Sequence, residues 1–139
     1  MMELLFENSN LVCNVALLFC MIQLHIVDDY MLQGVLAHMK QKNWWKDNYP
    51  QELYRKDYIV TLITHAFSWT FMIMIVPVAK GVYTDTLNTL HVIVFITNWV
   101  VHALVDDLKA NKFKINLLQD QVTHIVQILI TWALLVVLY

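Results

Sequence analysis

Histidine and aspartate recur four residues apart in three apolar stretches of this chain. The stretches are LHIVDDYML with His25 and Asp29, VHALVDDLK with His102 and Asp106, and DQVTH with Asp120 and His124. Residues four apart share one face of a helix, so the two side chains of each pair can point the same way. Imidazole nitrogen and carboxylate oxygen together suit Zn, Mn or Fe. The pairs therefore indicate a metal site, and the reversed order in the last pair needs an explanation.

The composition is that of a helical membrane protein. The 139 residues are 59% hydrophobic and only 14% charged, with two glycines and two prolines. That length suits a single domain covering residues 1–139. A net charge of −2 gives no reason to expect a nucleic-acid partner. The acidic N-terminus lacks the basic start of a signal peptide, so we expect the first apolar segment to be retained as an anchor.

Four apolar segments are long enough to cross a bilayer, which takes about 20 residues each. They cover approximately residues 11–32, 58–79, 86–108 and 117–139. Pro77 lies near the end of the second segment, where a helix can end at little cost. Short links between consecutive helices predict an all-α integral membrane protein, an antiparallel bundle of four transmembrane helices.

The basic residues predict the orientation of this bundle. Eight of the nine Lys and Arg residues fall in the first and third links, and only Lys80 lies on the other side. Because cytoplasmic loops collect Lys and Arg, both termini should lie on the non-cytoplasmic side. We expect a multi-pass protein of the inner (cytoplasmic) membrane that contacts membrane lipids, and a homo-oligomer stays possible. The aromatic residues of the first link predict interfacial anchoring or, alternatively, a lid over a site; they are Trp44, Trp45, Tyr49 and Tyr54.

Antiparallel packing explains the reversed pair. The first and third helices run inward and meet His before Asp, whereas the fourth runs outward and meets Asp120 before His124. In all three helices the aspartate is then closer to the cytoplasm, and the histidine lies about 6 Å deeper at 1.5 Å per residue. His65, early in the second helix, reaches the depth of the other histidines. The sequence thus predicts a layer of imidazoles beneath a layer of carboxylates.

A divalent cation would relieve the repulsion between several carboxylates placed in a poorly solvated bundle. The predicted ligands of one or two Zn, Mn or Fe ions are His25, Asp29, His65, His102, Asp106, Asp120 and His124. Asp28 and Asp107 should point about 100° away from the paired aspartates, toward an outer shell or solvent. Gln33, Gln121 and Asn98 are candidates for orienting the ligands. A metal-free hydrogen-bond network and a proton or ion pathway stay as alternatives.

These motifs resemble a family of small bacterial and phage membrane proteins designated domain of unknown function 3307. The resemblance covers nearly the whole chain and implies ten family positions: His25, Asp29, Gln33, His65, His102, Asp106, Lys109, Asp120, Gln121 and His124. Tyr30 departs from it, since phenylalanine is the residue expected there. The family brings no function with it. A looser similarity links the chain to small inner-membrane proteins described as metal-dependent hydrolases, which also set His and Asp at helix ends.

Three functions are compatible with these residues. A metal-dependent hydrolase would use His65 as a ligand or general base, and Lys109 to bind a lipid phosphate or a nucleotide. Lys109 has an alternative interpretation as a snorkelling residue. The second function is transport or sensing of a metal ion or protons. The third is a non-enzymatic interaction protein in which the polar residues only stabilise the bundle.

Overall fold

Helices make up almost the whole protein. The structure is a computed structural model that describes the backbone of residues 2–138 and the side chains of residues 10–138, and no β-strand occurs in that range. The four long helical segments are α1 (Met2–Ile26) with its π-helical continuation η1 (Val27–Leu32), α4 (Asp57–Tyr83), α5 (Thr89–Ala110), and α6 (Leu117–Trp132) with its π-helical continuation η3 (Ala133–Val137). The short elements of the first link are α2 (Leu36–Met39), α3 (Lys42–Asn48) and η2 (Glu52–Tyr54).

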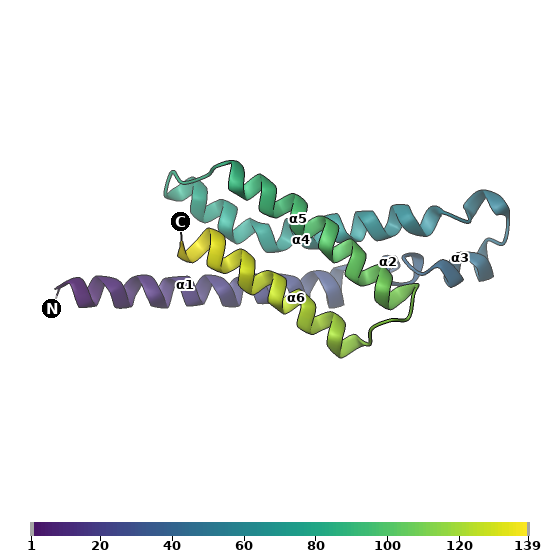
Figure 1. Ribbon diagram of the computed structural model, residues 1–139, viewed down its shortest axis with the longest axis horizontal. Helices are drawn as coiled ribbons and strands as arrows, with labels where there is room; N and C mark the ends of the chain where they lie inside the picture. Colours follow the sequence, from purple (N-terminus) through teal and green to yellow (C-terminus); the bar gives the residue numbers. More distant parts are fainter. Residues whose placement is uncertain (1, 139) are drawn as a thin grey trace.

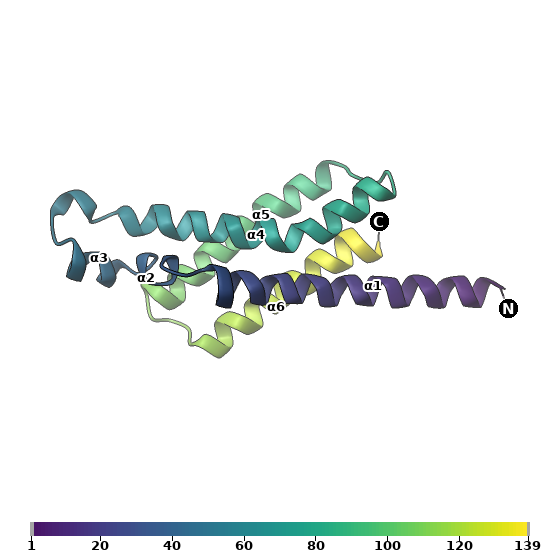
Figure 2. The same cartoon turned by 180° about the vertical axis from the view of Figure 1, so that it is seen from behind.

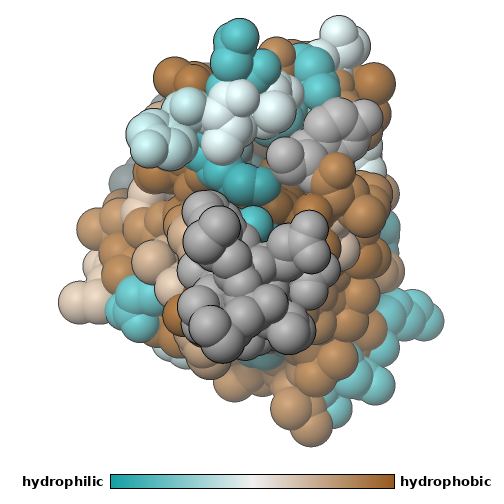
Figure 3. Space-filling model, turned by 90° about the vertical axis from the view of Figure 1, so that its left-hand side faces the viewer, coloured by the Kyte–Doolittle hydropathy of each residue, from teal (hydrophilic) through white to brown (hydrophobic). Residues whose placement is uncertain are grey.

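Four of these segments have the length and hydropathy needed to cross a membrane. They are Asn10–Leu32, Glu52–Tyr83, Thr89–Ala110 and Leu117–Val137. The predicted all-helical architecture with four membrane-length helices is therefore confirmed. Seen from the end that holds the termini, the visible flanks of the bundle are mostly hydrophobic (Figure 3). Large apolar side chains are exposed on all four segments.

The long helices alternate in direction. Both termini and the turn between α4 and α5 lie at one end of the molecule, and the two links that hold most of the basic residues lie at the other (Figures 1 and 2). Helix α4 packs along α5 and α1, and α6 crosses between α1 and α5. This is the antiparallel order that the reversed Asp–His pair requires.

Local sequence explains where most helices begin and end. Asn88 and Asn116 cap α5 and α6, and each forms a reciprocal capping box with the residue three positions later. Gly34 adopts a left-handed φ of 48°, which suits glycine, and turns the chain out of η1 into α2. Helix α4 does not end at Pro77 but continues to Tyr83. Proline removes one backbone hydrogen bond, and packing against neighbouring helices compensates for that loss in apolar bundles.

A hydrophobic core fills the half of the bundle nearer the termini. Trp69, Ile73, Ile128 and Leu135 are at most 1% exposed and pack with Met21 between the long helices. Trp69 sits at the boundary of this core, since its ring also contacts the imidazoles of the next layer. The core therefore lies directly against the layer of polar residues.

Candidate functional site

Eight acidic and imidazole side chains from all four long helical segments meet inside the bundle. We call them the His–Asp cluster: His25, Asp28, Asp29, His65, His102, Asp106, Asp120 and His124. The side chains of all eight are at most 8% exposed, with the exposed fraction of the four imidazoles at most 2%. The seven predicted ligands are thus brought together, and one residue beyond the prediction, Asp28, joins them.

The imidazoles form a compact layer. Nε2 of His65 lies 3.4 Å from Nε2 of His102, and the ring centroids of His102 and His124 are 4.2 Å apart. Two groups of three side chains place one ligand atom each within 4.8 Å of one another, a spacing that a metal ion could bridge. The groups are Asp29 with His65 and His102, and His102 with Asp106 and His124.

Two lysines reach the carboxylates from the end with the basic links. Nζ of Lys109 lies 2.6 Å from Oδ2 of Asp120, so Lys109 spans from α5 to α6. Nζ of Lys40 lies 2.6 Å from Oδ2 of Asp106, and the Lys40 side chain is only 9% exposed. Sequence reasoning missed Lys40, because a lysine in a link between helices normally points to solvent. No local pattern relates it to an aspartate 66 residues away.

Charge is unbalanced in this arrangement. Counted with ionised carboxylates and neutral imidazoles, the four aspartates contribute −4 and the two lysines +2, which leaves −2. Buried charge is costly unless it is paired. One divalent cation would bring the cluster to neutrality.

Hydrogen bonds assign the tautomer of His124. Nε2 of Gln127 donates to the backbone oxygen of Asn98, an atom that can only accept, at 3.3 Å. The side-chain oxygen of Gln127 must therefore face Nδ1 of His124, 3.3 Å away, and Nδ1 must carry the proton. Neutral His124 then presents the lone pair of Nε2 to the cluster, as a metal ligand requires.

His25 is held in the opposite tautomer. The indole N–H of Trp69, which can only donate, reaches Nδ1 of His25 at 2.7 Å. On the other side, the amide of Gln121 donates to Asp29 and Asp120, so its oxygen accepts from Nε2 of His25 at 3.2 Å. Both nitrogens of His25 are thereby engaged, and neither offers a free lone pair.

Several buried donor and acceptor atoms of the cluster have no hydrogen-bond partner. They are Oδ2 of Asp28, Oδ1 of Asp29, Nδ1 of His102, Oδ1 of Asp120 and Nε2 of His124. Leaving such an atom unpaired costs about 1–3 kcal/mol each. The nearest approach among them, 3.4 Å between Nε2 of His124 and Oδ1 of Asp120, lacks hydrogen-bond geometry. Unpaired nitrogen and carboxylate lone pairs in one buried place are the donor set of a transition metal, so these residues fit such an ion.

Asp28 lies differently from the prediction, whereas Asp107 does not. Asp28 is 2% exposed, accepts a hydrogen bond from Ser68 at 2.6 Å and lies 3.8 Å from Nδ1 of His65. Its segment is π-helical, and the wider turn reduces the rotation between consecutive residues, so that Asp28 and Asp29 both face inward. Of the two positions expected for Asp28, an outer shell and solvent, the structure therefore excludes solvent. Asp107 in regular α-helix points outward and pairs with Lys112.

A small opening connects the cluster with the outside. Its volume is about 160 Å³, and its walls are Asp29, Tyr30, Gln33, Lys40, Lys109, Leu117 and Gln121. Behind it stands His65, whose Nε2 lies 2.8 Å from the amide nitrogen of Gln33. His65 therefore contacts a residue of the wall of the opening, as His25 does through Gln121. Gln33 and Gln121, predicted as orienting residues, both line it.

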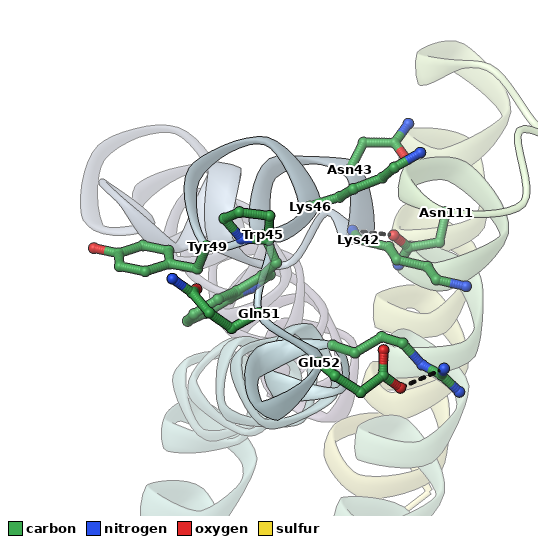
Figure 4. Close-up of a pocket in the computed structure, with 10 residues that line it drawn as sticks. Lys42, Asn43, Trp45, Lys46, Tyr49, Gln51, Glu52 and Asn111 are labelled. Carbon is green, nitrogen blue, oxygen red and sulfur yellow. Dashed lines mark hydrogen bonds and ion pairs between the residues drawn. The ribbon is translucent and has the colours of Figure 1, made fainter.

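A larger hollow of about 540 Å³ beside α3 is separate from the cluster and shares none of its residues. One residue of its wall, Asn111, helps to position Lys40, and Figure 4 shows Asn111 beside Lys42. The side-chain oxygen of Asn111, at the end of α5, accepts from the backbone N–H of Lys42 at 2.7 Å, and its amide donates to the backbone oxygen of Lys40 at 3.1 Å. The link is thus held on both sides of Gln41, with the Lys40 side chain directed at Asp106.

The remaining histidines lie outside the cluster. His91 takes part in the capping box of α5, and His38 is exposed on α2. Comparison of the chain with family models, with curated proteins and with solved structures finds no match. The resemblance of its motifs to domain of unknown function 3307 stays a prediction.

Proposed function

We propose that this protein spans the inner membrane four times, binds one or two divalent transition-metal ions in the His–Asp cluster at the cytoplasmic face, and hydrolyses a phosphorylated or lipid substrate there. The observation that supports it most is the set of unpaired lone pairs buried in one place, among them Oδ1 of Asp29 and Nε2 of His124. A metal-free network would be expected to pair these atoms with one another. The excess of −2 in the cluster points to the same class of ligand.

The hydrogen bonds divide the predicted ligands into two roles. The proposed ligands are Asp29, His65, His102, Asp106, Asp120 and His124, with Zn, Mn and Fe as the metals that suit them. His25 instead becomes a positioning residue, because Trp69 and Gln121 engage its two nitrogens. Gln127 and Gln121 hold imidazole and carboxylate groups in place, which metal sites generally require.

In hydrolysis each of these residues has a distinct task. A bound ion supplies Lewis acidity toward a phosphoryl or acyl oxygen. His65, behind the wall of the opening, would act as general base toward an attacking water, or as a ligand, once Gln33 releases the lone pair of its Nε2. Lys109 borders the opening, where its ammonium can bind an anionic group of the substrate. The apolar floor around Trp69 limits water to the side of the opening.

Metal content tests the proposal directly. Elemental mass spectrometry on the full chain, purified in detergent and supplied with Zn, Mn or Fe, should find one or two equivalents. His102→Gln and Asp106→Asn should lose that metal, because each removes a donor inside the cluster. His91→Gln is the matched control, since His91 is also buried but lies outside the cluster. Protein that stays metal-free with all three metals would refute the proposal.

A further inference from the structure

We infer that the opening of the His–Asp cluster is a subsite for the phosphate group of a membrane amphiphile, whose tail stays in the lipid beside η1 and α6. The inference rests on the proposed metal site and names the substrate of that site. Its basis is the wall of the opening, which joins two ammonium groups to two exposed apolar side chains.

The ammonium groups of Lys40 and Lys109 have N–H donors that their carboxylate partners do not use. Lys40 and Lys109 each contact one carboxylate oxygen at 2.6 Å, whereas an ammonium group has three N–H donors. Both lysines line the same hollow. Lys40 is nine-tenths buried, and its backbone is fixed by Asn111, so its position does not depend on a freely moving side chain. An anion in the hollow could accept hydrogen bonds from both lysines, and such charge-assisted bonds are the strong ones.

Charge makes phosphate binding depend on the metal. Counted with ionised carboxylates and neutral imidazoles, the cluster behind the opening carries −2 without a cation, and that charge would repel a phosphate group. A divalent ion removes that repulsion and competes with Lys40 for the charge of Asp106. The ammonium group of Lys40 can then donate a hydrogen bond to the anion. Because such coupling is reciprocal, phosphate should also strengthen metal binding.

The rim of the opening indicates an amphiphile. Tyr30 and Leu117 line the hollow and are 60% and 56% exposed. Both belong to membrane-length segments, and their neighbours Met31 and Leu118 are each 71% exposed. This side of the opening therefore faces lipid in an inserted protein. A phosphate held by the lysines would leave an attached alkyl chain beside these side chains.

Isothermal titration calorimetry on the full chain in a maltoside detergent tests the inference with two probes, inorganic phosphate and hexyl phosphate. Each is titrated into the metal-loaded and the metal-free protein. We expect hexyl phosphate to bind the loaded protein at least about tenfold tighter than inorganic phosphate, from burial of two or more methylene groups. Lys40→Gln and Lys109→Gln should each weaken both probes by about tenfold or more, because glutamine keeps a hydrogen bond but not the charge. Lys114→Gln, an exposed lysine at the same end, should change neither affinity.

The outcomes separate this inference from the proposed function. Metal content is measured in the same samples, so a metal-free wild type refutes the proposed function, whereas loaded protein that binds neither probe refutes only the subsite. Unchanged affinities in both glutamine variants would also refute the subsite. Equal affinities for the two probes would assign the subsite to a water-soluble phosphate ester and would overturn the inference that its ligand is an amphiphile. If circular dichroism shows that Lys40→Gln does not fold, the affinities of Lys109→Gln, at the more exposed lysine, test the subsite.

Discussion

The indole N–H of Trp69 donates a hydrogen bond to Nδ1 of His25 at 2.7 Å, while the face of the same ring stacks on His102 with centroids 4.1 Å apart. Trp69 thus occupies one nitrogen of His25 and neither nitrogen of His102, whose Nε2 lies 3.4 Å from Nε2 of His65. Histidines of equal depth and equal burial are thereby given different roles. Replacing His25 and His102 in turn tests this division.

His25→Gln should keep the metal stoichiometry that His102→Gln loses. Both nitrogens of His25 are engaged by Trp69 and Gln121, so its replacement removes support rather than a ligand. Metal equivalents by elemental mass spectrometry and the thermal midpoint by circular dichroism measure the two effects. We expect His25→Gln to lower the midpoint with metal still bound. Loss of metal as complete as in His102→Gln would contradict the assigned tautomer.

Gln127→Met should weaken metal binding by about 10–100-fold, the usual effect of removing a group that orients a ligand. The methionine sulfur accepts a hydrogen bond from Nδ1 of His124 only weakly, so Nε2 is no longer held as the free lone pair. Competition with a chelator measures the affinity. Gln127→Glu retains a hydrogen-bond acceptor and should keep most of the metal affinity. Thr123→Val, on the same helix and bonded only to the backbone, is the control; an equal loss there would point to general damage to α6.

Asn111→Ala should destabilise the protein by about 1 kcal/mol, since it removes one exposed and one part-buried hydrogen bond to the backbone of the first link. Its side chain bonds to the backbone of both Lys40 and Lys42 and so directs Lys40 toward Asp106. We expect phosphate affinity to fall along with stability. Chemical unfolding in detergent measures the stability, and calorimetry measures the phosphate affinity. Asn48→Ala, which removes one exposed bond to Trp44, should leave both within error.

Cysteine labelling should reveal the orientation in the membrane. In a background with Cys13 and Cys20 replaced by alanine, Tyr83→Cys lies at the α4–α5 turn and Asn43→Cys in the basic link. A membrane-impermeant maleimide should label Tyr83→Cys in intact cells and Asn43→Cys only after lysis, because basic loops stay in the cytoplasm. The reverse pattern would place the cluster at the outer face.

Much of the cluster could be predicted because helical periodicity is local. His102 and Asp106 share a helix face by spacing alone, and the alternation of helix direction explains why Asp120 precedes His124. Hydropathy over about 20 residues likewise predicts the four long helices, since the length of a span depends only on the bilayer. These features need no knowledge of which helix packs against which.

Tertiary structure alone decided how the predicted residues are used. Lys40 pairs with Asp106 across 66 residues, and Trp69 with His25 across 44, and no local pattern marks either contact. Asp28, in the π-helical turn, accepts a hydrogen bond from Ser68, 40 residues away in the sequence. A histidine has the same sequence signature whether its lone pair is free or engaged. Only the donors and acceptors that folding places around each ring determine whether it can bind a metal.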